Sequence, residues 1–355
     1  MRVAIDATPL TLSSGGLRRY TQEVSVALAE SFPPDEYFLV SDQRFGMPHT
    51  APINLRRGGG PRDPAERRWW LWGLNRELRR LEAGLFHGTD FAVPYLPRRP
   101  SVLTLHDLSP WMNAAWHSHA DRVRQRTPLL IGLGLATMIV TPSETVRKQA
   151  IERFRIHPDR IRAVPHAASA CFRPRSAGDG VAAAPGPPYF LYAGTLEPRK
   201  NIPGLLAAWR EVRRVHLVDL VLAGRPRSDF AQLSPEPGLQ IIGEVPDERL
   251  AELLAGTLAF VYPSCYEGFG LPVLEALQCG ACVIASRDPA IREVAAGAAI
   301  EAGSHTELVR AMLDIAGHPE WAEPWRERGL RRAAEFSWRR TAQLTHEVYE
   351  EALRR

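Results

Sequence analysis

Short apolar runs alternate with helical apolar stripes along the first half of this chain. Runs with the length and composition of buried strands are Arg2–Asp6, Tyr37–Ser41, Leu85–Asp90, Ser101–Asp107, Met138–Ser143 and Ile161–His166. Between the first two, Tyr20–Glu30 carries apolar side chains at positions 24, 27 and 28, the spacing of one helix face. Strands that alternate with helices in this way predict an α/β fold.

The second half repeats the alternation. Its expected strands are Tyr189–Ala193, Leu217–Gly224, Leu239–Asp247, Leu258–Tyr262 and Ala281–Ser286. Between the halves, Pro174–Pro188 is rich in Ala, Gly and Pro, which is typical of a linker. We therefore predict a first domain over residues 1–172, a linker over 173–188 and a second domain over 189–337.

The composition and the first residues of the chain indicate where in the cell the protein is expected. The chain has 355 residues, 45% of them hydrophobic and 24% charged, which suits two ordinary globular domains. No run of about 18 apolar residues could span a membrane. Met1–Asp6 reads as a strand and lacks the apolar core of a signal peptide, so a cytoplasmic protein is expected.

Two of the four cysteines form a Cys-x-x-Cys pair, Cys279 and Cys282. This spacing occurs in redox and metal sites, but here no second pair completes a zinc site. The pair also spans an expected helix end and strand start. We therefore interpret these residues as structural thiols.

Positive charge is concentrated in the first half. Residues 1–170 hold 23 basic and 16 acidic side chains, whereas residues 171–355 hold 21 and 24. Of the basic residues 42 are Arg, and Lys148 and Lys200 are the only Lys. A basic first half suits an anionic partner such as phospholipid headgroups or a lipid pyrophosphate. Nucleic acid is the rival interpretation, but no nucleic-acid-binding motif is present.

Trp and Arg gather in one expected helix, Glu66–Leu81, which contains Arg67-Arg-Trp-Trp-Leu-Trp72. This mixture suits a membrane interface or an acceptor-facing surface. The alternative is that Trp69 and Trp72 pack in the core.

A candidate site lies between an expected strand and helix in the second half. Glu267 falls in the loop after Leu258–Tyr262, and Glu275 falls in the helix that Pro272 begins and Gly280 ends. Backbone N–H groups and the positive end of the helix dipole meet at this loop. The alternative is an ordinary helix N-terminus with a favourably placed Glu.

A second candidate is an anion site. Arg199 and Lys200 stand just before an expected helix, with Asn201 predicted as its cap. Two cations beside a helix N-terminus suit a diphosphate, and each charged hydrogen bond could contribute roughly 1.5–3 kcal/mol. A solvated pair of charges is the alternative.

The first half offers weaker signals. Gly15 and Gly16 lie in a loop between a strand and a helix, a natural phosphate-facing turn. His106 ends a strand, and ligands of α/β sheets bind at such ends. Trp111–His119 is predicted to lie on the acceptor side. His117 and His119 could bind metal, but a solvated loop is the favoured interpretation.

The two second-half motifs together resemble retaining nucleotide-sugar glycosyltransferases of family 4. The resemblance rests on Glu267-Gly-Phe-Gly-Leu-Pro-Val-Leu-Glu275 and Gly194-Thr-Leu-Glu-Pro-Arg-Lys-Asn201, and it extends over nearly the whole length. It implies two Rossmann-like domains that face across a cleft, the B-type glycosyltransferase fold. It also implies that the last helix, residues 338–355, returns to the first domain.

The same resemblance implies residue roles. Arg199 and Lys200 match the ligands of the donor diphosphate, and Glu275 matches the acceptor of ribose hydrogen bonds. Glu267 matches the donor-sugar contact, together with His106. The remaining expected donor contacts are Gly15, Gly16, Thr195, Val245, Gly268, Phe269, Gly270 and Leu271. The catalytic group is thus expected to be Glu267, His106, Arg199 and Lys200.

The sequence departs from the family pattern at one position and lacks one common metal-binding motif. Arg18 stands where many members of the family carry a second Gly, so Arg18 or Arg19 could supply charge there instead. No Asp-x-Asp occurs, so we expect no metal. The loops resemble mannosyltransferases of bacterial surface polysaccharide, which favours GDP-mannose over UDP-sugars.

The expected acceptor is a glycan, lipid-linked at the inner membrane face. A non-catalytic homologue that binds sugar nucleotides, or a glycoside hydrolase with two carboxylates, is the alternative.

Overall fold

The computed structural model describes residues 1–117, 120–174, 187–228, 230–231 and 233–355. These residues form two compact units. Unit 1 comprises Met1–Asn113, His119–His166 and Ser337–Arg355, and unit 2 comprises Ala114–Ser118 and Ala167–Phe336. Most of the expected linker, residues 175–186, lies outside the described residues.

Unit 1 is built on a parallel sheet of seven strands among the described residues, in the order β3-β2-β1-β4-β5-β6-β7. The strands are β1 (Arg2–Asp6), β2 (Glu36–Val40), β3 (Leu55–Arg57), β4 (Leu85–Gly88), β5 (Ser101–Thr104), β6 (Met138–Thr141) and β7 (Ile161–Ala163). Strands β1, β2, β4, β5 and β6 are buried along all or most of their length, as expected for a parallel sheet covered on both faces, whereas only the first residue of β3 and of β7 is buried.

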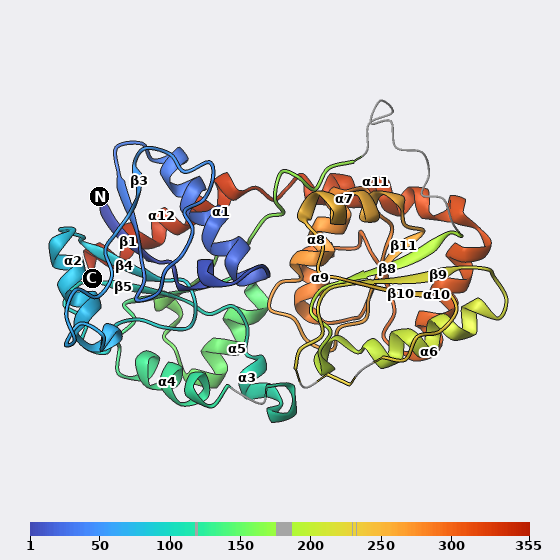
Figure 1. Cartoon of the computed structure of the whole chain (residues 1–355), viewed down its shortest axis with the longest axis horizontal. Coiled ribbons are helices and arrows are strands. Elements are labelled where there is room, and N and C mark those ends of the chain that lie inside the picture. The colour runs from blue at the N-terminus through green and yellow to red at the C-terminus, as the bar shows by residue number, and fades with distance from the viewer. Residues whose placement is uncertain (118–119, 175–186, 229, 232) are drawn as a thin grey trace. The chain divides into compact units, whose positions relative to one another are not determined.

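Helices cover both faces of this sheet (Figure 1). They are α1 (Gly16–Ser31), α2 (Leu74–Arg80), α3 (Ser109–Met112), α4 (Asp121–Gly132), α5 (Glu144–Phe154) and α12 (Trp338–Arg354). Helices α1 and α12 pack against each other and share one apolar core with β1, β2 and β4. In that core Tyr20 and Leu28 of α1 and Tyr349 of α12 are fully buried. The last helix of the chain is therefore part of unit 1.

Unit 2 has a parallel sheet in the order β10-β9-β8-β11-β12-β13. Its strands are β8 (Tyr189–Ala193), β9 (Asp219–Ala223), β10 (Leu239–Gly243), β11 (Ala259–Tyr262), β12 (Val283–Ala285) and β13 (Ile300–Glu301). The helices are α6 (Ile202–Arg213), α7 (Asp247–Gly256), α8 (Leu271–Gln278), α9 (Pro289–Ala295), α10 (His305–Gly317) and α11 (Glu323–Ala333). Helices α6 and α10 pack together, as do α8 and α11 (Figure 1).

Both sheets reverse their strand order at one point, between β1 and β4 in unit 1 and between β8 and β11 in unit 2. At such a switch point the connections leave in opposite directions, so the loops at the carboxyl ends open a crevice suited to ligands. In unit 2 the two loops are those that carry Lys200 and Glu267.

Three local expectations differ from the structure. The first concerns Asn201, whose side chain makes no capping hydrogen bond, so that prediction is wrong. Asn201 joins a 3₁₀ turn, Pro198–Lys200, to α6 and adopts a left-handed conformation with φ 54°. Asn tolerates that conformation better than most residues do. Its side chain lies over Gly204, where an added Cβ would come within 2.6 Å of Oδ1.

The second concerns the expected helix Glu66–Leu81. A π-helical turn, Trp69–Gly73, leads into α2, and Glu66 lies in the preceding turn. A Cβ on Gly73 would lie 2.2 Å from the Glu66 carbonyl oxygen, so only Gly allows this close approach. Each interpretation of the tryptophans fits one residue: Trp69 is buried, as a core residue would be, whereas Trp72 is 43% exposed.

The third concerns the end of the first domain, expected at residue 172. Ala167–Phe172 instead belongs to unit 2, because Phe172 is fully buried in the core of that unit. Gln278 of α8 also donates to the carbonyl oxygens of Ser169 (2.9 Å) and Phe172 (2.7 Å). These bonds fasten the segment to the end of α8.

Among the described residues, no helix combines the length and the apolar character that crossing a membrane requires.

Candidate functional site

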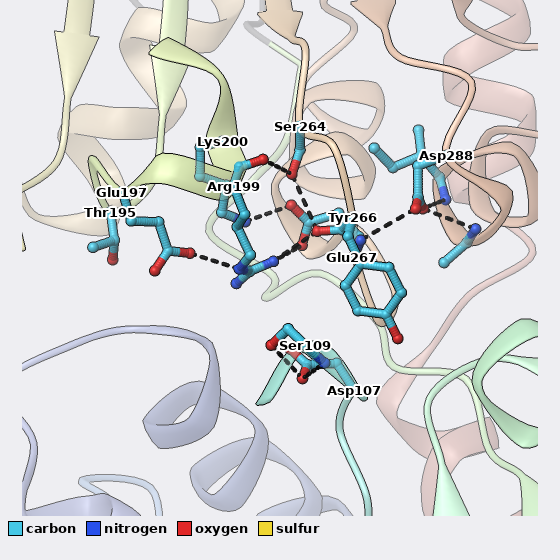
Figure 2. A network of polar contacts seen from close by, with 12 residues as sticks. Asp107, Ser109, Thr195, Glu197, Arg199, Lys200, Ser264, Tyr266, Glu267 and Asp288 are labelled. Atoms are coloured by element: carbon cyan, nitrogen blue, oxygen red, sulfur yellow. Dashed lines mark hydrogen bonds and ion pairs between the residues drawn. The ribbon is translucent and has the colours of Figure 1, made fainter. Parts of the chain in front are cut away.

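The loops after β8 and β11 meet through one buried ion pair in unit 2 (Figure 2). The Lys200 ammonium donates to Glu267 Oε1 at 2.5 Å and to the Tyr262 hydroxyl at 2.7 Å. Lys200 and Glu267 are each only 6% exposed. Two residues 67 positions apart are thus held as a pair at the switch point of the sheet.

Arg199 widens this pair into a network. Its Nη1 donates to Glu267 Oε2 at 3.2 Å and to the Tyr266 carbonyl oxygen at 2.8 Å. Its Nε lies 2.8 Å from Glu197 Oε1. The other oxygen of Glu197 accepts from Arg227 at 3.1 Å. The guanidinium is therefore held by two carboxylates, Glu197 and Glu267, and by a backbone carbonyl.

The charges of this network set its protonation. Burial raises the pKa of Glu267, but Lys200 and Arg199 outweigh burial and bring the pKa to about 2. Burial and the neighbouring Arg199 lower the pKa of Lys200, whereas Glu267 opposes that shift. Because the carboxylate is so strongly favoured, Glu267 is ionised at neutral pH and acts as an acceptor of hydrogen bonds.

Asp288 supports the Glu267 loop from the far side. Its Oδ1 caps α9 by accepting from the N–H groups of Ala290 (2.9 Å) and Ile291 (3.1 Å). Its Oδ2 accepts from the Glu267 N–H at 3.3 Å. Burial raises the Asp288 pKa to about 6. The sequence analysis missed this residue, although Asp before Pro at a helix start is a capping signal.

Two glycines bring the loops after β8 and β9 together. The backbone has φ +136° at Gly194 and +143° at Gly224, a region that favours Gly. A Cβ on Gly224 would lie 2.0 Å from the Gly194 carbonyl oxygen. The absence of side chains therefore lets one loop lie directly on the other and brings Arg227 within reach of Glu197.

The other residues expected at the donor site lie around the same edge. Glu275 is buried within α8, and Gly270 precedes that helix with φ +95°. Phe269 packs edge-on against Phe336 at 6.0 Å between ring centroids. The Thr195 carbonyl accepts from the Tyr192 hydroxyl at 3.0 Å. Gly268 and Leu271 flank Phe269 and Gly270, and Val245 lies in the loop between β10 and α7.

In unit 1, His106 follows β5 and its ring packs edge-on against Tyr20. His106 Nε2 lies 2.7 Å from the Thr89 carbonyl oxygen, which can only accept, so Nε2 carries a proton. Burial lowers the His106 pKa, although Asp90 opposes the shift. A neutral ring with a proton on Nε2 leaves Nδ1 as a hydrogen-bond acceptor.

The glycine loop of unit 1 is open. Gly15 caps α1 with φ +104°, and no atom lies within 4 Å of a Cβ built on Gly15 or Gly16. Arg18, which stands in place of a glycine, donates through Nη1 to the carbonyl oxygens of Leu10 (2.5 Å) and Leu12 (2.8 Å). Arg18 thus holds the preceding turn in place.

The sequence analysis also missed Asp6 at the carboxyl end of β1. It is 2% exposed and accepts from the backbone N–H (3.0 Å) and the hydroxyl (2.6 Å) of Thr8. Burial raises its pKa to about 7, and the two bonds from Thr8 oppose the shift. An apolar run ending in Asp gives no sequence signal that separates such a carboxyl from an exposed one.

Within the described ranges, no cluster of three or more His, Cys, Asp or Glu could hold a metal ion. His119, one of the two histidines considered as ligands, lies outside these ranges. The four cysteines are free thiols, and burial raises the pKa of both Cys279 and Cys282 to about 12. Such thiols are poor nucleophiles at neutral pH.

The fold and the sequence of this site define a glycosyltransferase of the B-type fold. The family described as glycosyl transferases group 1 matches residues 179–332, and the one described as glycosyltransferase family 4 matches residues 14–170. The O-antigen chain mannosyltransferase B of Escherichia coli is 35% identical over an alignment of 293 positions, which covers 77% of this chain and 75% of that protein. The chain belongs to glycosyltransferase family 4.

Solved structures agree on the fold. A sucrose-phosphate synthase from Thermosynechococcus elongatus superposes with a TM-score of 0.77 at 18% identity, over 99% of this chain and 98% of that one. The Anabaena protein Alr3699/HepE in complex with UDP-glucose superposes with a TM-score of 0.74 at 16% identity, over 99% and 100%.

Proposed function

We propose that this glycosyltransferase transfers mannose from GDP-mannose to a lipid-linked glycan in bacterial polysaccharide synthesis, with retention of anomeric configuration. The buried Lys200–Glu267–Arg199 network carries the proposal, because it holds two cations at the switch point where a donor diphosphate would bind. The mannosyl group is favoured by the similarity to an O-antigen chain mannosyltransferase. UDP-sugars are the second choice, since a structural neighbour binds UDP-glucose.

In the proposed reaction, Arg199 and Lys200 neutralise the charge that develops on the departing diphosphate. Two protein cations can supply this stabilisation without a metal ion. The ionised Glu267 accepts hydrogen bonds from sugar hydroxyls and so orients the donor. The donor phosphate takes the proton of the acceptor hydroxyl as that oxygen attacks from the same face. In this proposal Glu275 binds the ribose and His106 contacts the sugar.

The proposed acceptor implies work at the inner face of the cell membrane. A surface of unit 1 favours such peripheral contact: Trp72 is exposed in one segment with Arg67 and Arg68, and Leu96 is exposed in a second segment with Arg98 and Arg99. We call this set the basic tryptophan surface. The Asn75 side chain joins the two segments by donating to the Leu96 carbonyl oxygen. The nearby acids Asp63 and Glu66 pair with Arg76 and Arg80 and therefore do not neutralise it.

Nucleotide binding tests the proposal most directly. The Lys200→Ala variant is expected to bind GDP about 10- to 150-fold more weakly, the loss of one or two charged hydrogen bonds. Lys148→Ala removes the only other Lys, which is exposed on α5, and provides the matched control. Calorimetric titration with GDP, UDP and ADP measures the effect. A UDP preference would overturn the choice of donor, and no binding of any nucleotide would overturn the diphosphate site.

Transfer itself needs a second experiment. Incubation with GDP-mannose and a lipid-linked glycan should yield a new glycoside with the α configuration of the donor, measured by proton NMR of the product. Release of free mannose alone would favour a hydrolase, and binding without turnover would favour a non-catalytic homologue. Glu267→Gln is expected to lower kcat at least 10-fold, and unchanged turnover would remove Glu267 from the mechanism.

A further inference from the structure

A short segment from the first half of the sequence belongs to unit 2. Ala114–Ser118 is grouped with unit 2, although the chain before and after it is grouped with unit 1. Its 3₁₀ turn, Ala114–Trp116, packs beside the turn Pro198–Lys200 that carries the two site cations. The sequence predicts that this stretch lies on the acceptor side.

Trp116 contacts the Arg199 network through its backbone. The Trp116 carbonyl oxygen accepts a hydrogen bond from Arg227 Nη1. The same nitrogen donates to Glu197 Oε2 at 3.1 Å, and Glu197 Oε1 lies 2.8 Å from Arg199 Nε. Because Glu197 is only 6% exposed, this chain of contacts is well shielded from water and salt.

The indole ring contacts the network from the other side. It stacks on Tyr266, with 6.0 Å between ring centroids and 23° between planes. Tyr266 is 4% exposed, and its carbonyl oxygen accepts from Arg199 Nη1 at 2.8 Å. Two of the groups that contact the Arg199 guanidinium, the Tyr266 carbonyl and (through Arg227) Glu197, are therefore linked to Trp116, whereas Glu267 contacts Arg199 independently.

We infer that Trp116 is a positioning residue for Arg199 and thereby sets the affinity of the site for a nucleoside diphosphate. The inference rests on the proposed role of Arg199 as a diphosphate ligand. Without the ring, the Tyr266 backbone loses one wall that keeps its carbonyl in line with Nη1. Arg199 then samples more orientations, and a bound diphosphate must order it again.

The test is GDP affinity measured by calorimetric titration. Trp116→Ala is expected to weaken GDP binding about 3- to 10-fold, the range for a lost aromatic pair, and Trp116→Phe is expected to restore most of it. GMP affinity should change less than GDP affinity, because the second phosphate is the one that needs an ordered cation. Trp321→Ala, which removes an exposed indole elsewhere in unit 2, is the matched control and should leave both affinities unchanged.

A double-mutant cycle separates positioning from general damage. If Trp116 acts through Arg199, Trp116→Ala should have no further effect on GDP affinity in an Arg199→Ala background. Equal losses in both backgrounds would overturn the inference even if Trp116→Ala weakens folding. If the Lys200 and Arg199 variants lose GDP affinity but Trp116→Ala does not, the inference about Trp116 would be overturned and the proposed function would stand. Failure of the wild type to bind any nucleotide would instead overturn the proposed function.

Discussion

At the scale of single residues, the cations of the site already have partners. Lys200 pairs with Glu267, and Arg199 pairs with both Glu267 and Glu197. An arriving diphosphate therefore competes with two carboxylates for two cations. The binding free energy is the difference between cations paired with the diphosphate and cations paired with the carboxylates. The affinity for the donor therefore depends on Glu197 and Glu267 as much as on the cations themselves.

His87 gives a residue-scale prediction about pH. It is fully buried, with Nδ1 2.7 Å from the Tyr349 hydroxyl and Nε2 2.7 Å from the Thr104 hydroxyl. Burial lowers its pKa to about 3. Below about pH 6.5 the unfolded chain binds a proton that the folded chain excludes, so the free energy of unfolding falls as pH falls. Between about pH 7 and 5, the free energy of unfolding of His87→Gln should fall by about 2 kcal/mol less than that of wild type. Urea titrations at each pH measure it.

Tyr349→Phe is the control, because it removes a hydrogen bond of His87 but keeps the titrating ring. It should retain the pH dependence of wild type. Asp6, whose pKa burial raises to about 7, contributes the opposite slope, but it does so in every variant and cancels in the comparison. An equal flattening of the pH dependence in both variants would contradict the prediction.

The sequence identified Arg199, Lys200 and Glu267 because their neighbours form long, specific motifs. It did not indicate Asp288, Glu197 or Trp116 as supporting residues. Their roles depend on contacts between residues far apart in the chain, such as Trp116 with Arg227 and Tyr266. Such pairs carry no local periodicity or spacing from which they could be predicted.

At the scale of elements, the contact between the loops after β8 and β9 has a testable cost. Gly224→Ala would place a methyl group 2.0 Å from the Gly194 carbonyl oxygen, so one loop must move. We expect a loss of about 1–3 kcal/mol in the free energy of unfolding beyond that of the control. Gly194→Ala is the control: its φ is similar, but its methyl group would lie 3.2 Å from the Tyr192 hydroxyl, a tight contact rather than an overlap with backbone. Chemical denaturation followed by tryptophan fluorescence measures both, and equal losses would contradict the clash.

The basic tryptophan surface gives a second element-scale prediction. Two hydrogen bonds hold its parts together: Tyr95 N–H to the Trp70 carbonyl and Asn75 Nδ2 to the Leu96 carbonyl, both 2.9 Å. Replacing Arg67 and Arg68 by Ser should weaken binding to vesicles that contain phosphatidylglycerol about 10- to 30-fold, since each Arg near an anionic surface contributes about 1 kcal/mol. Sedimentation with the vesicles measures the effect.

Arg339 and Arg340, an adjacent exposed pair on α12, provide the charge-matched control. Their replacement by Ser should leave vesicle binding near that of wild type. If both double variants lose affinity equally, the net charge of the protein rather than this surface would explain the binding.

Elements were predicted well where apolar runs are long. Strand β8 has the expected bounds, and β11 begins one residue later than expected and ends at the expected Tyr262. Prediction was poorer where one residue decides the geometry. Gly73 permits the π-helical turn and Asn201 takes a left-handed conformation, and neither outcome follows from hydrophobic periodicity.

At the scale of the whole molecule, neither unit is one continuous stretch of sequence. Unit 1 requires Ser337–Arg355, and unit 2 includes Ala114–Ser118. The strand pattern and the linker composition predicted two α/β domains, and the similarity to the family predicted the return of the last helix. The inclusion of Trp116 in unit 2 could not be predicted, because the surrounding sequence continues the first domain.

Removal of α12 should therefore destabilise the rest of unit 1, which lies far from α12 in sequence, rather than unit 2, which directly precedes α12. A chain ending at residue 336 loses Tyr349 and Val348 from the core of unit 1, together with the Arg162–Glu351 ion pair. We expect amide hydrogen exchange to become fast in β1, β4 and α1 but to stay slow in β8 and β11. Equal acceleration in both units would show that they unfold as one body. Deletion of Arg354 and Arg355 alone, which are exposed, is the control.

The position of α12 also affects the order of events during synthesis. The ribosome releases the strands of unit 1 first, but the helix that covers their apolar face is released last, after all of unit 2. Unit 2 can thus finish folding before the unit that began earlier. In the meantime side chains such as Val3 and Leu85 lack their final covering and are available to chaperones. Slow translation of the codons for α12 would lengthen that interval.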